Sequence, residues 1–281
     1  MSDRIFLKIT HETLPQVREK YPFIYLEHGR LEVDDSSVKW IDALGNVVKL
    51  PIASISTILL GTGTSVTHAA IKSCSRANCT ICWVGEDSLL FYAVGQAPTA
   101  TSKNFRKQML LATDKVKAEK VARNMFLFRF PSSEVENKNI KELMGMEGHR
   151  VKNNYRLLSE KYQTGWKGRV CSPTNFELSD ITNLIINHAN NALYAILSSC
   201  VYSLGYSPYI GFIHSGSPLP FIYDLADLYK ENTTIDLAFA LTKQMSIHYD
   251  KRVLVNELCD RIVNHRILER VADDIDKIFK V

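Results

Sequence analysis

Glu147 is an acidic residue at a position where the pattern of the chain calls for an apolar one. The stretch 139–158 repeats apolar side chains at the spacing of a helix that buries one face. One column of that face, with a residue every fourth position, consists of Leu143, Glu147, Val151 and Tyr155. A helix that buries this column also buries a negative charge, which is costly unless the charge meets a metal ion, a cation or a proton. Glu147 is therefore a candidate site residue.

The neighbours of Glu147 support the same interpretation. Ile140, Met144 and Leu158 extend the apolar face that we expect to be buried. Gly145 and Gly148 flank the carboxylate, and we expect them to let a backbone or a ligand come close, at some cost in helix propensity.

A second stretch, 205–230, contains the other candidate residues. His214 lies between an apolar run and a loop rich in glycine and proline, and Asp224 and Asp227 are spaced to share one face of a helix. Glutamate, histidine and aspartate together suit a hard cation, Mg²⁺ or Mn²⁺, and the imidazole shifts the preference toward Mn²⁺. Such a cation polarises a phosphodiester and lowers the pKa of an attacking hydroxyl or water. The alternatives are a loop histidine and a solvated acidic pair, which are both common.

Positive charge is concentrated around Glu147. Residues 101–170 contain 16 lysines and arginines against 7 acidic residues, a net charge of +9, whereas residues 1–100 carry −1 and residues 171–281 carry −4. A polyanion such as nucleic acid is the natural partner of such a segment. The alternative is a set of solvated helix faces opposite the apolar ones.

The cysteines and the apolar segments indicate a reducing compartment and no membrane. We expect the six cysteines to be reduced thiols: Cys74, Cys79, Cys82, Cys171, Cys200 and Cys259. Cys79 and Cys82 form a CxxC, but a zinc site needs a second ligand pair, so buried thiols are favoured over zinc or redox chemistry. No run approaches the ~20 apolar residues of a membrane span, and the N-terminus lacks a signal region. We expect a cytoplasmic protein.

The elements that must position these residues indicate an α+β protein. Short β-rich segments separated by turn residues fill the first 95 positions and predict a compact antiparallel β-sandwich with one helix beginning near Ser65. The run 61–65 lacks the lysine of a phosphate-binding loop and is interpreted as a tight turn between a strand and that helix. We therefore expect an N-terminal β-sandwich domain at 1–95, a linker at 96–103 and an all-α catalytic domain at 104–281.

Three long helices are expected in the second domain. One spans roughly 102–129, the second contains Glu147, and the third begins at Ser179 or Asp180 and runs to about 204. Shorter helices complete the chain.

At this point the residues resemble a known family. The segment 146–155 is similar to the "(I/M)EGxxAxxYF" signature of the CRISPR-associated integrase, the metal-dependent subunit of CRISPR adaptation. The segments 205–216 and 221–227 are similar to its second signature, "GxxPxxGFxHxG…SxxYDxAD". The segments 25–31 and 82–86 resemble its N-terminal domain. The likeness extends over roughly residues 22–240 and is closest to the compact type I-E branch.

The resemblance implies a site, a reaction and partners. One divalent cation, Mg²⁺ or Mn²⁺, would be bound by Glu147, His214 and Asp227, with Asp224 as a supporting acid beside it. The family forms homodimers, and two of them flank a dimer of a small second adaptation protein with a ferredoxin-like fold. The complex captures short double-stranded DNA and inserts it into the repeat array, each 3′-hydroxyl attacking a phosphodiester. The family also cuts DNA.

Contacts to DNA are expected from the basic residues near the site and from one further arginine, namely Arg150, Lys152, Arg156, Arg169 and Arg252. Two positions depart from the family pattern. His28 occupies a slot where an aromatic residue packs on the duplex end in relatives, and Ser217 follows the second signature where lysine is common. The chain ends at Val281 without a proline-rich tail, so we expect no tail-mediated contact.

Two other functions stay open from the sequence. The first is a non-catalytic, helical DNA-binding scaffold whose acidic cluster is structural. The second is a metal-dependent nuclease that acts on branched DNA outside CRISPR adaptation.

Overall fold

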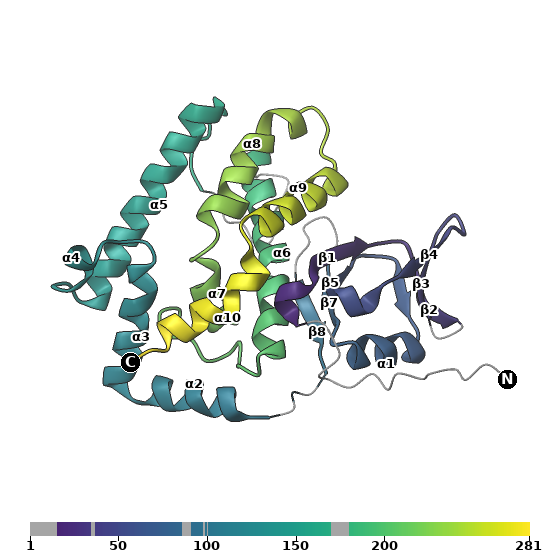
Figure 1. Cartoon of the computed structure of the whole chain (residues 1–281). Coiled ribbons are helices and arrows are strands. Elements are labelled where there is room, and N and C mark those ends of the chain that lie inside the picture. Colours follow the sequence, from purple (N-terminus) through teal and green to yellow (C-terminus); the bar gives the residue numbers. More distant parts are fainter. Residues whose placement is uncertain (1–15, 35–36, 86–90, 98, 100, 170–179) are drawn as a thin grey trace.

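The chain has a part built from β-sheets followed by a part built from helices. The computed structural model describes residues 16–34, 37–85, 91–97, 99, 101–169 and 180–281. Figure 1 shows the sheets on one side of the molecule and the helices on the other. The expected order of β-rich and helical parts is confirmed.

The described strands form two four-stranded sheets. Their orders are β1-β5-β7-β8 and β4-β3-β2-β6. The strands are β1 (Tyr21–Leu26), β2 (Gly29–Asp34), β3 (Ser37–Asp42), β4 (Val47–Leu50), β5 (Ile55–Leu60), β6 (Thr64–Val66), β7 (Thr80–Val84) and β8 (Phe91–Gly95). The short helix α1 (His68–Arg76) begins after Thr67, whose hydroxyl accepts the N–H of Ala70, and not at Ser65. Strand β6 lies where the sequence predicted the end of a turn and the start of this helix.

The prediction of a purely antiparallel arrangement is wrong. β5 pairs in parallel with β1 and β7, and β2 pairs in parallel with β6, while β2–β3, β3–β4 and β7–β8 are antiparallel. All six residues of β5 are buried. A continuous apolar run of this kind is typical of a parallel strand that is covered on both faces.

The helical part begins with two helices where the sequence predicted one. α2 (Lys103–Thr113) and α3 (Lys115–Leu127) are separated at Asp114, whose backbone is extended. The Asp114 carboxylate accepts the N–H groups of Val116 and Lys117 and so caps α3. A side chain that satisfies the free donors of a new helix start competes with continuation of the old helix.

The two other long helices are confirmed. α5 (Ile140–Tyr162) begins with a capping box between Asn139 and Glu142, and α6 (Ile181–Ser203) begins at Asp180, which accepts the N–H of Asn183. The remaining helical elements are α4 (Ser132–Val135), α7 (Pro220–Ala226), the π-helical η4 (Glu231–Ile235), α8 (Asp236–Met245), α9 (Lys251–Asn264) and α10 (Ile267–Ile278), with 3-10 turns η1 (Val17–Glu19) and η2 (Ile52–Ser54) before α1.

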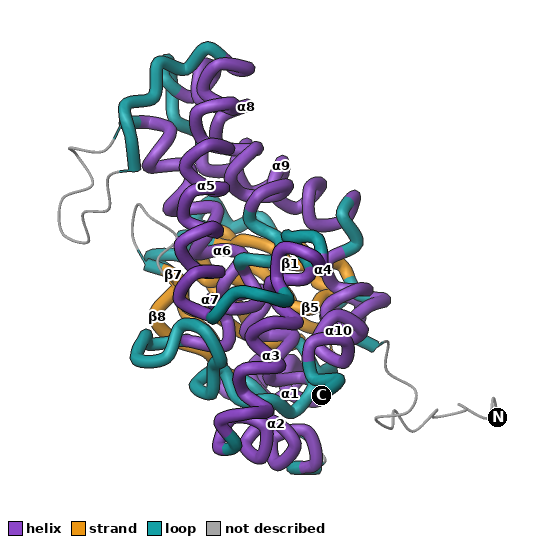
Figure 2. Tube along the Cα trace, turned by 90° about the vertical axis from the view of Figure 1, so that its left-hand side faces the viewer, coloured by secondary structure: helices purple, strands orange, loops and turns teal. Residues whose placement is uncertain are grey.

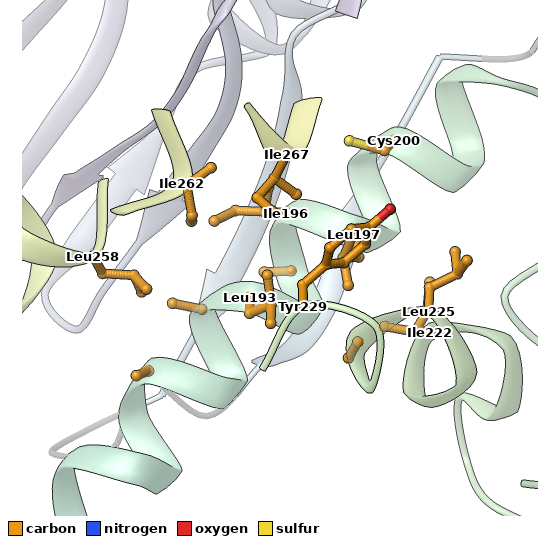
Figure 3. Packing of buried hydrophobic residues seen from close by; sticks show 14 of the residues in the cluster. Leu193, Ile196, Leu197, Cys200, Ile222, Leu225, Tyr229, Leu258, Ile262 and Ile267 are labelled. Atoms are coloured by element: carbon orange, nitrogen blue, oxygen red, sulfur yellow. The ribbon is translucent and has the colours of Figure 1, made fainter. Parts of the chain in front are cut away.

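The larger hydrophobic core does not follow the predicted domain boundary. It joins Phe23, Leu59 and Cys82 of the first sheet to the buried face of α6. Figure 3 shows the helical side of this core, where residues of α6 pack with residues of α7, α9 and α10. The boundaries at 95 and 103 stay a prediction, although β8 ends at Gly95 and α2 begins at Lys103.

A smaller core lies among the two sheets and α1. It contains Leu31 and Trp40 of the second sheet, Ile58 and Ile81 of the first, and Cys74 of α1. The described cysteines, 74, 79, 82, 200 and 259, are buried free thiols as expected, and Cys171 lies outside the described residues. No helix in the described part is long and apolar enough to cross a membrane.

Helix α5 lies along the outside of the helical part, where it contacts α3 and α8. Figure 2 views this side of the molecule, with α5 in front. Glu147 is in the first half of α5. It lies beside Arg129, which follows α3, and it lines a pocket with residues of the segment that runs from α7 through η4 into α8.

Candidate metal centre

Glu147 is mostly buried, and two arginines neutralise it. Its side chain is 16% exposed. Arg150, one turn later on α5, donates to both carboxylate oxygens at 3.0 and 3.2 Å. Arg129, which follows α3, places Nη1 3.4 Å from Oε1. The sequence argument that this charge must meet a partner is confirmed, and the partners in this structure are cations of the chain itself.

The rest of the predicted apolar face is only partly buried. Leu143 and Leu158 are buried as expected, but Met144 is 46% exposed, so its placement on the buried face is wrong. A Cβ added at Gly145 or Gly148 would meet nothing within 4 Å. The expected close approach of a backbone is therefore not seen among the described residues, whereas the approach of a ligand stays a prediction.

Asp224, a buried residue of α7, binds the backbone of the loop that carries His214. Its carboxylate accepts three backbone N–H groups, from Phe212 at 2.6 Å, Ile213 at 3.2 Å and His214 at 3.0 Å. The loop passes so close that a Cβ at Gly211 would lie 3.0 Å from Asp224 Oδ2. Only a residue without a side chain fits there, which explains the glycine in this segment.

The same carboxylate orients the imidazole. His214 Nδ1 lies 2.8 Å from Asp224 Oδ1, and Nε2 lies 3.5 Å from Asp227 Oδ2. The hydrogen bond that His214 donates to Asp224 and the charges of both aspartates raise the pKa of His214, against the lowering effect of burial. A carboxylate that fixes one imidazole nitrogen and presents the other is the usual support of a metal-binding histidine.

Asp227 and Glu147 line one pocket of about 250 Å³. Asp227 Oδ1 accepts a 2.9 Å hydrogen bond from Lys230, whose ammonium also lies over the ring of Tyr194. Burial disfavours the charge of Lys230, but Asp227 and Tyr194 raise its pKa above the ordinary value. The pocket is lined by Glu147, Arg150, Val151, Asn154, Tyr155, Arg169, Asn190, Tyr194, Asp227, Lys230, Glu231 and Ile235.

The donor chemistry of the predicted ligands fits a hard divalent cation, but their placement does not yet form a coordination shell. Two carboxylates and one oriented imidazole are the donors that Mg²⁺ and Mn²⁺ accept. Within the described ranges, however, no three His, Cys, Asp or Glu side chains are close enough to bind a metal ion together. His214 and Asp227 are brought together, and Glu147 lines the same pocket as Asp227 while its oxygens face arginines.

The predicted DNA contacts fall in three places. Lys152, Arg156 and Arg169 line a groove of about 820 Å³ between α5 and residues 166–169, together with Lys167. Arg150 lies in the smaller pocket, paired with Glu147 and Glu231. Arg252 is 84% exposed at the start of α9 and lines neither cavity.

Two cations of the site, Lys230 and Arg129, were not predicted from the sequence. Lys230 follows Asp227 by one helical turn, so its spacing was a usable signal. Arg129 had no local signal, because it reaches Glu147 only through the packing of α3 against α5.

Comparison with known proteins shows the family. The family model described as "CRISPR associated protein Cas1" matches residues 23–133 and 129–259. The chain is 55% identical over 275 residues to "CRISPR-associated endonuclease Cas1 2" of Chlorobaculum tepidum, covering 98% of this chain and 93% of that protein. It is 34% identical over 237 residues to "CRISPR-associated endonuclease Cas1" of Escherichia coli, covering 84% and 78%.

Solved structures show the same likeness. The chain in "Crystal structure of TtCas1-DNA complex" has a TM-score of 0.83 at 30% identity, with 92% of both chains covered. "Casposase bound to integration product" has a TM-score of 0.71 at 15% identity, covering 92% of this chain and 90% of that one, which is a likeness of fold. On the extent of these matches, the chain belongs to the Cas1 family of CRISPR-associated endonucleases.

Proposed function

We propose that this protein is a Mg²⁺- or Mn²⁺-dependent DNA integrase and endonuclease of CRISPR adaptation. The observation that carries the proposal is the arrangement around Asp227, in a chain of the Cas1 family. The imidazole of His214, oriented by Asp224, faces Asp227, and Asp227 shares a pocket with Glu147. Glu147, His214 and Asp227 would bind the cation.

The chain's own residues have defined tasks in this reaction. Asp224 keeps the proton of His214 on Nδ1, so that Nε2 offers its lone pair to the cation. The bound cation would polarise the phosphodiester and neutralise charge in the transition state. Lys230 and Arg150, in the same pocket, place positive charge where a DNA phosphate would enter.

The groove beside the pocket is the proposed path of the DNA. It shares Val151, Tyr155 and Arg169 with the pocket, so the groove and the proposed cation site lie next to each other. Lys152, Arg156 and Lys167 supply charge for phosphates, and Tyr155 and Trp166, with ring centroids 4.8 Å apart, supply aromatic surface for bases. Such contacts are largely independent of sequence, and the affinity falls steeply as salt rises.

The homodimer and the small ferredoxin-like partner are part of the proposal. β4 is the edge strand of its sheet and exposes Val47 and Val48 by 54% and 52%, with Leu44 before it exposed by 88%. An exposed apolar edge strand is a template for pairing with another chain, which supports a second copy at this edge. His28, at the β1–β2 turn with a positive φ of 54°, donates its backbone N–H to Thr62 and is proposed to meet the duplex end. A cytoplasmic location and membership of the type I-E branch stay predictions.

Strand transfer with ligand variants tests the proposal. Glu147→Ala and Asp227→Ala should abolish joining of a short duplex to a plasmid that carries the repeat, because each removes a charged ligand. Duplex binding should stay within a few-fold. Glu257→Ala, an exposed glutamate on α9, is the control and should join DNA normally.

The outcomes separate the three functions. Unchanged joining in both ligand variants would support the non-catalytic scaffold. DNA that is cut by the unmodified protein in Mn²⁺ but never joined would support a nuclease outside CRISPR adaptation.

A further inference from the structure

Arg129 is a buried cation that the reaction described above does not use. It follows the end of α3, and its side chain is only 6% exposed. Its guanidinium packs on the ring of Phe126, 5.1 Å from the ring centroid, and places Nη1 3.4 Å from Glu147 Oε1. This is a close approach of a full positive charge to a proposed cation ligand.

The hydrogen bonding of Arg129 is incomplete. In the described part of the chain, Nε and Nη1 are buried without a hydrogen-bond partner, so the contact with Glu147 is an ion pair without hydrogen-bond geometry. A buried arginine with unsatisfied donors is costly. Its presence needs compensating interactions, and the structure offers nearby negative charge in addition to the ring of Phe126.

That negative charge comes from several residues of the site. Burial lowers the pKa of Arg129, and the charges of Glu147, Asp227 and Asp224 oppose this effect. Arg129 therefore interacts electrostatically with two proposed cation ligands, Glu147 and Asp227, and with Asp224, which supports His214.

The two other cations of the site are more firmly engaged. Arg150 is bonded to Glu231 as well as to Glu147, and Lys230 donates directly to Asp227. Arg150 is also 25% exposed, so water can replace its contact. Of the two arginines next to Glu147, Arg129 is the buried one, and packing on Phe126 keeps it in place.

We propose that Arg129 is a positioning residue that acts as the built-in counter-ion of the metal pocket. In the metal-free protein it keeps the carboxylates compatible with burial, and it opposes the entry of a divalent cation by charge repulsion. The pocket then binds metal less tightly than its ligands alone would allow. An incoming DNA phosphate adds negative charge, which offsets the repulsion and raises the metal affinity. The inference rests on the proposed cation site.

Metal affinity of a charge-removing variant tests the inference. Mn²⁺ binding is measured by calorimetry, and thermal unfolding is measured with and without Mn²⁺. Arg129→Gln should bind Mn²⁺ on the order of tenfold more tightly, because a like charge a few ångströms away shifts an ionic equilibrium by at least that factor. Its melting temperature should fall without Mn²⁺ and recover more with Mn²⁺ than that of the unmodified protein.

Two further variants serve as comparisons. Arg129→Lys keeps the charge and should bind Mn²⁺ within about threefold of the unmodified protein, since the repulsion is retained. Arg123→Gln removes an arginine of α3 that pairs with Glu119 outside the pocket, and it should leave Mn²⁺ binding unchanged.

The results decide between a counter-ion and a packing role. Unchanged or weaker Mn²⁺ binding by Arg129→Gln overturns the inference, because an arginine that only packs on Phe126 would lower stability equally with and without metal. If this variant does not fold, the double variant Arg129→Gln/Glu147→Gln, which removes both charges, should fold again, and its failure to do so overturns the inference. If the unmodified protein binds no Mn²⁺, or if its binding does not depend on His214 and Asp227, the proposed function itself fails.

Discussion

Asp224→Asn is the substitution that probes the architecture of the site most sharply. Asp224 is 1% exposed and accepts N–H groups of Phe212, Ile213 and His214, in addition to its bond with the imidazole. An asparagine keeps the shape and one acceptor oxygen. If that oxygen stays with His214, the new amide NH₂ faces the N–H groups of Phe212 and Ile213, which lose their acceptor.

The magnitude follows from these two lost bonds. A hydrogen bond to a charged group contributes about 1.5–3 kcal/mol, so losing two of them lowers the free energy of unfolding by roughly 3–6 kcal/mol. The imidazole also loses its fixed orientation, and changes to such supporting carboxylates weaken metal binding by about 10–100-fold.

Urea denaturation and Mn²⁺ calorimetry measure the two effects. Asp273→Asn, at an exposed position on α10, is the control and should leave both values near those of the unmodified protein. A loss of stability below about 1 kcal/mol together with unchanged Mn²⁺ affinity in Asp224→Asn would refute the assignment of Asp224 as the support of His214.

Three other predictions follow from the geometry. Gly145→Ala should raise the free energy of unfolding by about 1 kcal/mol because its Cβ meets open space in a helix. Gly211→Ala should lower the free energy of unfolding, because its Cβ would lie 2.6 Å from Pro220. Urea denaturation of both variants checks the opposite signs. Trp166→Ala should lower stability by roughly 3 kcal/mol, since it removes the ring that packs on Tyr155, and should weaken single-stranded DNA binding in a fluorescence titration. Lys152→Gln should reduce the salt dependence of DNA binding by about one charge, and Arg252→Gln, outside the groove, should change it less.

Much of the site could be predicted from the sequence because its signals are local. The apolar column and the carboxylate within it together indicated that Glu147 is buried and needs a partner. The glycine and proline around His214 and the spacing of Asp224 and Asp227 placed these residues near one another. The structure adds what spacing alone does not contain, namely that Asp224 is fully enclosed by the loop and orients His214.

Other features depend on packing between distant segments. The sequence does not show strand direction, so the parallel pairing of β5 was missed although its continuous apolar run was visible. The break at Asp114 depends on whether the backbone continues the hydrogen bonds of α2 or the Asp114 side chain caps α3, and here the cap forms. Arg129 is far from Glu147 along the chain, and only the return of α3 toward α5 makes it part of the site.

The central claim is that Glu147, His214 and Asp227 bind one divalent cation. Anomalous diffraction from a crystal of the protein soaked in Mn²⁺ measures this directly. We predict one peak within roughly 2.0–2.5 Å of a carboxylate oxygen of Glu147, of Nε2 of His214 and of a carboxylate oxygen of Asp227, with Arg150 displaced from Glu147. Mn²⁺ bound at other residues, while Glu147 keeps its hydrogen bonds to Arg150, would contradict it.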